Sequence, residues 1–408
     1  MKIDLNKCRQ MEPIKLTSLL SASLVTLAVS YVPFGVAKLT PNPITTESGM
    51  AIVPFLNLST GYNDNLAKSN QQQAKSAFSI IESGVGFMVE PEGNKTLLGY
   101  RFRNGTYFSS QQDNFTDHYL DLSSDWELNS RHRIGFEYNL ALAHEGRGEN
   151  DTTLGLDYNQ YESHTANVGY GFGSTEAIGR IETNLGWQDF TYQNNRTVTQ
   201  YQDWDELRFN STFYYQALPR TSFIAQVIAN SRGYDVIAPG ASSKDNNHYF
   251  GYLGASWDAT GKLQGNAKLG YQQKDFDAST RKDFDSFSWD VDVTYLIRTY
   301  SALQLVTNRR STDSDGDGDA IDAATYQVNW THNWDTKWTT EAALIRLNED
   351  YTASNRKDDT TNATLRASYD FRRWLALEVG FGREKKDSNI DSLSYSQNVY
   401  YLTVQGVM

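Results

Sequence analysis

The residues of this chain whose types and spacing most clearly suggest a binding site lie in a short acidic stretch, Asp313-Ser314-Asp315-Gly316-Asp317-Gly318. Carboxylates at alternate positions followed by glycine match the first half of a calcium-binding loop. The bidentate glutamate that should close such a loop is absent, because Ala324 stands at its position. Two interpretations remain open: Asp313, Asp315 and Asp317 bind calcium weakly, or they form a solvated acidic loop.

The histidines do not form a recognisable catalytic or zinc-binding motif. None is spaced as in H-E-x-x-H, and no G-x-S-x-G, phosphate-binding or dinucleotide motif stands in a fitting context. The only cysteine is Cys8, close to the N-terminus. We therefore expect no enzymatic activity and no cofactor. A Ser-His-Asn or Asp-His set assembled only in three dimensions stays open, because one sequence cannot reveal it.

A larger group of charged residues alternates with apolar ones. Ile134, Phe136 and Tyr138, for example, share one face of a segment whose other face carries Glu137. Alternation with period two indicates β-strands with one apolar face. If such strands close into a barrel, the charged face lines a lumen. The predicted pore-lining residues are Arg101, Arg103, Glu137, Arg180, Glu182, Glu206, Arg208, Lys268, Asp290, Asp292, Arg366 and Glu378.

Two functions are open for these charges. They form ion pairs and solvated wall charges, which cost little in a wet lumen, or they form a selectivity track for a charged or hydroxylated polymer. Few aromatic side chains, such as Tyr252 and Trp374, are predicted to face the lumen. That scarcity argues against a dedicated path for stacking sugar rings.

The elements that must position these residues are about 18 alternating segments. The alternative count is 16, because single-chain bacterial barrels have even strand numbers. They lie near 51–62, 76–89, 96–109, 116–128, 133–145, 160–172, 177–190, 203–216, 221–231, 248–257, 262–274, 284–297, 301–310, 324–334, 338–347, 361–371, 374–383 and 395–408. The gaps between them alternate between short and long. The long gaps are 63–73, 146–158, 232–247, 275–283, 311–323, 348–359 and 384–394.

This layout predicts an all-β fold, a transmembrane antiparallel up-and-down β-barrel with short periplasmic turns and longer extracellular loops. A soluble β-sandwich would show the same local alternation. The composition suits long strands, since 13% of residues are aromatic and only 8 are proline. Tryptophans stand near segment ends, as in an interfacial girdle. The net charge of -12 argues against a nucleic-acid partner, because binding to phosphates needs a basic surface.

The N-terminus resembles a targeting segment. Residues 1–15 are basic, residues 16–32 form a short apolar core, and small residues end at Ala37. This order predicts a cleaved signal peptide at 1–37, with an N-terminal membrane anchor as the alternative and Met11 as another start. Residues 38–50 would then form a periplasmic segment and residues 51–408 an outer-membrane barrel.

Several short motifs resemble one known family. The stretch from Phe55 to Asn65, which ends in Gly-Tyr-Asn-Asp-Asn, is similar to the first strand of the putative beta-barrel porin 2 family. Residues 117–119, 128–132 and 144–148 are similar to its third hairpin. The resemblance covers most of residues 51–408.

The resemblance implies a function. Members of that family are encoded beside exopolysaccharide and capsule synthesis genes, and they are regarded as outer-membrane conduits for the polymer. It implies as partners the polysaccharide itself, periplasmic polysaccharide-export and co-polymerase proteins, and outer-membrane lipid. The main alternative is a general or sugar-selective porin for small solutes. A structural adhesin is disfavoured, because the predicted external loops are short and polar.

Overall fold

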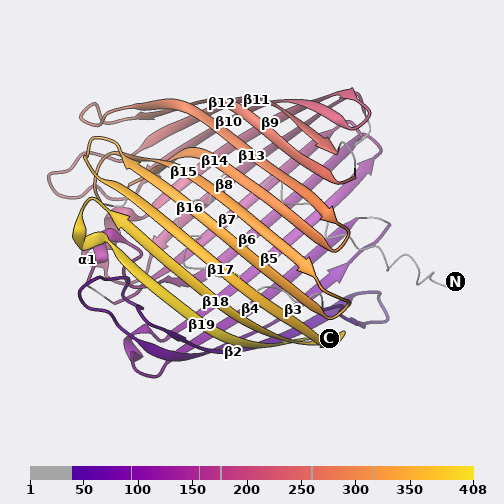
Figure 1. Ribbon diagram of the computed structural model, residues 1–408. Helices are drawn as coiled ribbons and strands as arrows, with labels where there is room; N and C mark the ends of the chain where they lie inside the picture. The colour runs from indigo at the N-terminus through magenta and orange to yellow at the C-terminus, as the bar shows by residue number, and fades with distance from the viewer. Residues whose placement is uncertain (1–38, 93, 156, 175–176, 259–260, 315) are drawn as a thin grey trace.

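The computed structural model describes residues 39–408 except 93, 156, 175–176, 259–260 and 315. The predicted signal peptide, residues 1–37, lies outside the described residues. Long antiparallel strands run obliquely around a closed wall (Figure 1). Among the described residues, no helix is long and apolar enough to cross a membrane.

The wall consists of β2 to β19, and β1 is a short strand before them. In chain order they are β1 (Ile44–Thr45), β2 (Ala51–Asn63), β3 (Ser76–Val89), β4 (Lys95–Tyr107), β5 (Phe115–Asn129), β6 (His132–Glu145), β7 (Asn159–Phe172), β8 (Gly179–Tyr192), β9 (Trp204–Leu218), β10 (Thr221–Tyr234), β11 (Asn246–Asp258), β12 (Leu263–Phe276), β13 (Phe284–Arg298), β14 (Ser301–Asp313), β15 (Ala320–Asn333), β16 (Trp338–Tyr351), β17 (Lys357–Arg372), β18 (Leu375–Ser388) and β19 (Tyr395–Val407). The short helix α1 (Arg196–Thr199) and four 3-10 turns (Gln111–Asp113, Asp151–Thr153, Gln200–Gln202 and Asp391–Leu393) lie in the connections at the long-loop end.

The barrel closes between its first and last wall strands. Each strand pairs antiparallel with its neighbours in sequence, and β19 pairs with β2 through Tyr400 and Tyr62 and through Val404 and Leu58. The prediction of an 18-strand antiparallel barrel is therefore confirmed. An even strand number puts both ends of the wall on one side, as Figure 1 shows. We call that side the short-turn end and the opposite side the long-loop end.

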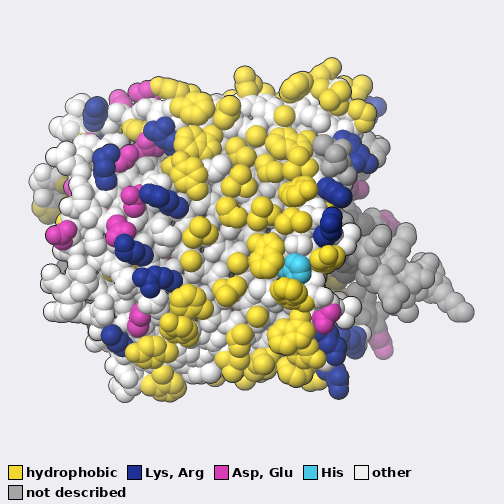
Figure 2. Space-filling view, in the orientation of Figure 1, with side chains coloured by type: hydrophobic (Ala, Val, Ile, Leu, Met, Phe, Trp, Pro, Cys, Tyr) yellow, Lys and Arg dark blue, Asp and Glu magenta, His cyan; other side chains and the backbone are white. Residues whose placement is uncertain are grey.

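The two faces of each strand differ in polarity, as the alternation predicted. Leu56 and Leu58 point outward and are exposed, whereas Ser59, on the other face of β2, is buried beside Thr403. The outward apolar side chains form a broad belt, with charged side chains beyond both of its edges (Figure 2). Such a belt buries its apolar surface only against lipid, which excludes the soluble sandwich.

Several strands extend further than the sequence predicted. The stretches 311–323, 348–359 and 384–394 were predicted as loops, but β14 continues to Asp313, β15 begins at Ala320 and β18 continues to Ser388. Beyond the apolar belt both faces of a strand meet water or polar groups. The alternation in hydropathy therefore ends there, although backbone pairing continues.

The segment before the barrel folds back on the short-turn end. Ile44 and Thr45 of β1 pair with the first residues of β2, and the backbone N–H of Thr40 donates to the carbonyl of Arg373, 2.9 Å away, in the turn after β17. Residues 39–50 thus lie beside the short turns.

Aromatic rings pack over glycines on the lumen face of the wall. The ring of Tyr401 lies where a side chain on Gly380 would stand, and its hydroxyl donates to Glu378 at 3.1 Å. Tyr401 is buried. Packing a ring over a glycine of the neighbouring strand links the two strands and fixes their register.

A substitution at Gly380 tests this packing. Gly380→Val should displace the Tyr401 ring and lower the free energy of unfolding in urea by about 1–3 kcal/mol, the usual cost of overpacking. Gly251→Val is the matched control, because an added side chain at Gly251 meets nothing within 4 Å. Equal stability of the two variants would contradict the proposed packing.

Candidate functional site

The pairing register puts every predicted pore-lining residue on the lumen face, opposite the exposed apolar side chains. Most of the charged ones lie beside an opposite charge on the same or a neighbouring strand. Asp292, which accepts from Gln304 at 3.0 Å, has an amide partner instead. This arrangement favours wall ion pairs over an open charged track. The pairs are Arg101–Glu82 and Arg103–Asp117 at 3.8 Å, Arg180–Glu182 at 3.3 Å, Lys268–Asp290 at 3.6 Å, Arg366–Glu341 at 2.6 Å, and Arg208–Glu206.

A cavity of about 650 Å³ occupies the lumen below the long loops. It is bounded by strands from both sides of the barrel and by the loops after β2 and β6. Lysine and arginine side chains are as numerous in its lining as carboxylates. The cavity therefore carries many charged groups but is nearly neutral in net charge. Its charged lining residues are Lys68, Arg101, Arg103, Arg232, Lys244, Lys386, Asp117, Glu145, Glu149, Asp151, Asp313 and Glu349.

The prediction of few lumen aromatics is wrong. Tyr161 and Phe190 stack with ring centroids 4.9 Å apart, and Phe190 stacks on Trp204 at 5.6 Å with an interplanar angle of 8°. All three line the cavity, together with Tyr119. Trp374, in contrast, lies in the turn between β17 and β18 and is half exposed.

Guanidinium groups cover several of these rings. Arg232 lies 3.8 Å from the centre of Trp204, and Arg101 lies 4.0 Å from the centre of Tyr119. A guanidinium stacked on a ring can still donate through the N–H groups at its edge, and those of Arg232 donate to Glu206 and Asp313. The walls therefore combine fixed donors with apolar ring surface.

The outer part of β14 leaves the wall and bends into the lumen. Pairing between β13 and β14 ends at Trp289 and Arg309, although β13 begins at Phe284. Side chains replace the missing backbone bonds: Ser288 Oγ donates to the Arg309 carbonyl at 2.5 Å, and the Ser311 N–H donates to Gln272 on β12 at 2.8 Å. We call residues 310–314 and 316–323 the inner hairpin.

The carboxylate of Asp313 lies at the centre of a cluster of contacts that holds the inner hairpin, in addition to the contacts of Ser311 and Asp319. It accepts from Arg232 at 2.8 Å and from the Tyr234 hydroxyl at 2.9 Å, both on β10. It also pairs with Lys274 of β12, whose side chain is buried, and accepts from Asn246 of β11 at 3.3 Å. A buried cation without its carboxylate is costly, so this contact strongly favours the bent position.

The predicted calcium ligands do not lie together in one open loop. Asp313 lies among cations at the end of β14, Asp317 accepts from the Ser354 hydroxyl at 2.8 Å, and Asp315 is outside the described residues. In the part of the chain that the structure describes, no group of three His, Cys, Asp or Glu residues could hold a metal ion. Calcium binding stays a prediction.

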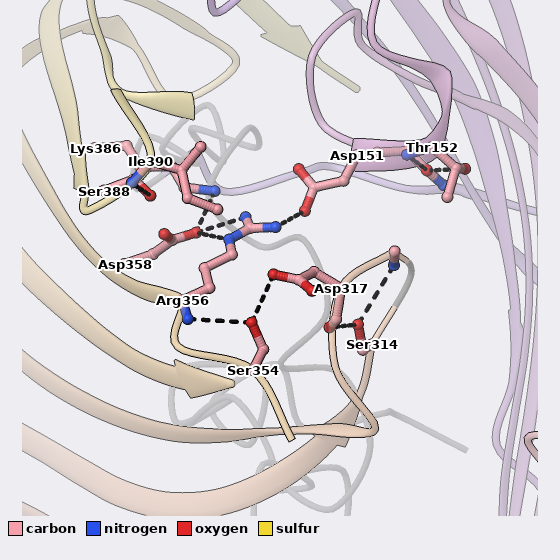
Figure 3. Close-up of polar contacts among 12 residues, drawn as sticks. Asp151, Thr152, Ser314, Asp317, Ser354, Arg356, Asp358, Lys386, Ser388 and Ile390 are labelled. Carbon is pink, nitrogen blue, oxygen red and sulfur yellow. Dashed lines mark hydrogen bonds and ion pairs between the residues drawn. The ribbon is translucent and has the colours of Figure 1, made fainter. Parts of the chain in front are cut away.

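The tip of the inner hairpin meets the opposite wall (Figure 3). Arg356, in the connection after β16, binds Asp358 at 2.6 Å and also binds Asp151 in the loop after β6. A side chain on Gly316 would stand 3.4 Å from Cβ of Asp151. Loops from distant parts of the chain therefore meet across the outer mouth.

A second set of ion pairs holds the loop after β2 in place. Lys68 pairs with Glu384 at 3.1 Å and with Glu149 at 3.5 Å. Burial disfavours its charge, but Glu384, Tyr395 and Glu149 outweigh burial and raise the pKa of Lys68 well above its usual value. Lys68 is therefore a permanent cation that links the loops after β2 and β6 to the end of β18.

Sequence reasoning missed the residues that close the mouth. Lys274, Arg232 and Arg356 were not predicted as site residues, and Asp313 was predicted in a different role. Lys274 and Arg232 do alternate with outward residues of their strands, which was a usable signal for a lumen position. Their common partner is about 40 to 80 residues away in sequence, and no local pattern reveals such a contact.

The family match and the likeness to one solved structure agree with this fold. The family model described as "Putative beta-barrel porin 2" matches residues 49–407. The outer membrane protein OpdK from Pseudomonas aeruginosa is 10% identical, with a TM-score of 0.50 over 88% of this chain and 99% of that one. The siderophore receptor PirA from Acinetobacter baumannii is 7% identical, with a TM-score of 0.47 over 88% and 80%. No curated protein matches significantly. At these identities the structural likeness to OpdK concerns the fold alone.

Neutralising Asp313 should release the inner hairpin. Asp313→Asn removes the carboxylate from Lys274, and we expect a higher single-channel conductance in planar lipid bilayers because the hairpin no longer crosses the lumen. Asp322→Asn is the matched control: Asp322 lies on the same hairpin but binds Arg309, away from Asp313. Unchanged conductance of a folded Asp313→Asn variant would contradict this role.

A disulfide should lock the mouth. The spacing between Gly316 and Asp151 suits a disulfide, for which Cβ atoms lie about 3.5–4.5 Å apart. The double variant Asp151→Cys with Gly316→Cys should crosslink on oxidation, seen as a mobility shift on denaturing gels that a reductant reverses. The single variants are the controls. Failure to crosslink in the folded protein would show that the two loops do not meet.

Proposed function

Because this chain belongs to the putative beta-barrel porin 2 family, we propose that it is a gated outer-membrane conduit for the secretion of an exopolysaccharide or capsular polysaccharide. The chain is an outer-membrane β-barrel of the porin type. The observation that carries the finer proposal is the charge-balanced cavity below the closure that the inner hairpin and the loop after β6 form. A conduit needs neither a cofactor nor a catalytic step.

The chemistry of the cavity suits a hydroxylated polymer. A wall with equal numbers of cations and carboxylates attracts neither strong anions nor strong cations, and its many donors and acceptors can replace the water around sugar hydroxyls. Ring surfaces such as that of Tyr161 add weak contacts to C–H groups. Weak, repeated contacts allow a chain to slide.

The closure suits a route that must not leak. A permanently open lumen wide enough for a polymer would also pass small molecules. In the resting structure the inner hairpin and the loop after β6 cross the outer mouth. The connection after β16 links them, since Arg356 binds Asp151 and the Ser354 hydroxyl donates to Asp317. We propose that the arriving polymer displaces the hairpin, with the contacts of Asp313 as the main resistance.

The partners follow from the same proposal. Periplasmic polysaccharide-export and co-polymerase proteins would deliver the polymer to the short-turn end, where β1 and Thr40 lie beside the turn at Arg373. The alternative function is a general or sugar-selective porin. The small volume of the closed cavity also suits single solutes, so the two functions need a direct test.

Deletion of the gene from its host should abolish or strongly reduce secreted polysaccharide, measured as surface and medium polymer. The wild-type gene should restore secretion. The Asp151→Cys and Gly316→Cys double variant should restore it only when a reductant keeps the mouth unlocked. Undiminished secretion in the deletion strain would end the export proposal.

A porin would behave differently in the same strains. Deletion would then slow uptake of small sugars while secretion stayed normal, and liposomes with the purified wild-type protein would swell rapidly in mono- and disaccharides. For a closed conduit we expect slow swelling with the wild type and faster swelling with Asp313→Asn.

A further inference from the structure

Basic side chains gather on the outer surface of β16 to β18, just beyond the apolar belt at the long-loop end (Figure 2). Arg346 lies two residues beyond the exposed Leu344 on β16, and Arg383 lies two residues beyond Phe381 on β18. Lys385 follows on β18. We call Arg346, Arg383 and Lys385 the basic patch.

The pairing register brings these cations around the small outward side chains of β17. Arg346 and Lys385 both lie opposite Thr361 of β17, one on each side. Arg383 lies opposite Ala363, the next outward residue on the same strand. Neighbouring strands are about 4.8 Å apart, so Arg346 and Lys385 flank the small side chains of β17 at about 10 Å. Long basic side chains can converge over the space above Thr361 and Ala363.

The existing partners of the basic patch bind its side chains only weakly. Arg346 lies 3.5 Å from Asp359, and Lys385 lies 2.8 Å from Asp387, with every one of these side chains more than half exposed. Exposed ion pairs of this kind are worth little and exchange readily. Arg383 donates to the neutral amide of Asn398 at 3.2 Å. The patch can therefore take a further anion.

The position of the patch limits what that anion is. Below it on the outer surface lie the exposed Leu344 and Leu365 and the rings of Phe381 and Tyr400, which contact each other at a tilt. Acyl chains must cover these apolar groups. The cations thus lie at the level of the lipid headgroups of the outer leaflet. Arginine binds phosphate through paired N–H groups, and lysine adds a point charge.

We propose that the basic patch is a binding site for a phosphorylated lipid headgroup of the outer leaflet, with the acyl chains of that lipid on the apolar surface below. The basic patch lies on one side of the barrel. At the same level, the outer surface of β7 to β9 carries carboxylates instead, with Asp189 opposite both His164 and Asp205. The inference does not depend on which molecule crosses the lumen.

Native mass spectrometry of the purified barrel in detergent tests the proposal, with diphosphorylated lipid A, its dephosphorylated form and inorganic phosphate as probes. We expect the diphosphorylated lipid to bind best. The triple variant Arg346→Gln, Arg383→Gln, Lys385→Gln should bind it about tenfold more weakly. The matched control is Arg131→Gln, Arg220→Gln, Arg298→Gln, which removes the same charge from exposed positions in or next to short turns.

A second variant separates loss of the site from loss of folding. Asp359→Asn with Asp387→Asn removes the competing carboxylates and should tighten binding of the diphosphorylated lipid, which a damaged barrel would not do. Three results would each overturn the proposal: unchanged binding by the triple variant, equal binding of the dephosphorylated lipid, or binding of inorganic phosphate as tight as that of the lipid.

Discussion

The structure depends on one constraint, that every backbone N–H and C=O within a bilayer must find a partner in the protein. Pairing of β19 with β2 meets it by removing both free edges of the sheet. Closure then divides all side chains between an outer apolar belt and a polar lumen. It also fixes which residues can approach one another, since only lumen side chains can meet across the barrel.

The constraint weakens at the edge of the belt, and the inner hairpin forms there. Pairing between β13 and β14 stops where the charged Arg309 faces outward, and polar side chains such as Ser288 satisfy the freed backbone groups. The same break within the belt would leave those groups facing lipid. The closure therefore lies at the outer mouth, because only there can backbone groups that lose their strand partner be satisfied by polar side chains or water.

The barrel could be predicted from sequence because each strand carries its own alternating pattern. All eighteen wall strands were found, since segments such as that around Phe136 bury one face in lipid regardless of distant residues. Strand ends such as that at Asp313 were missed, because both faces are polar there. The stacking of Phe190 on Trp204 and the pairing of Arg356 with Asp151 were also missed, since those partners meet only after closure.

The bond between Arg356 and Asp151 joins residues 205 positions apart in sequence. It connects the loop after β6 with the connection after β16, which lie far apart around the circumference. This ion pair restrains the distance between two opposite parts of the outer rim, and so it resists deformation of the rim into an oval. The rim of the resting barrel is then stiff, and loss of the ion pair would change its mechanical compliance as well as its aperture.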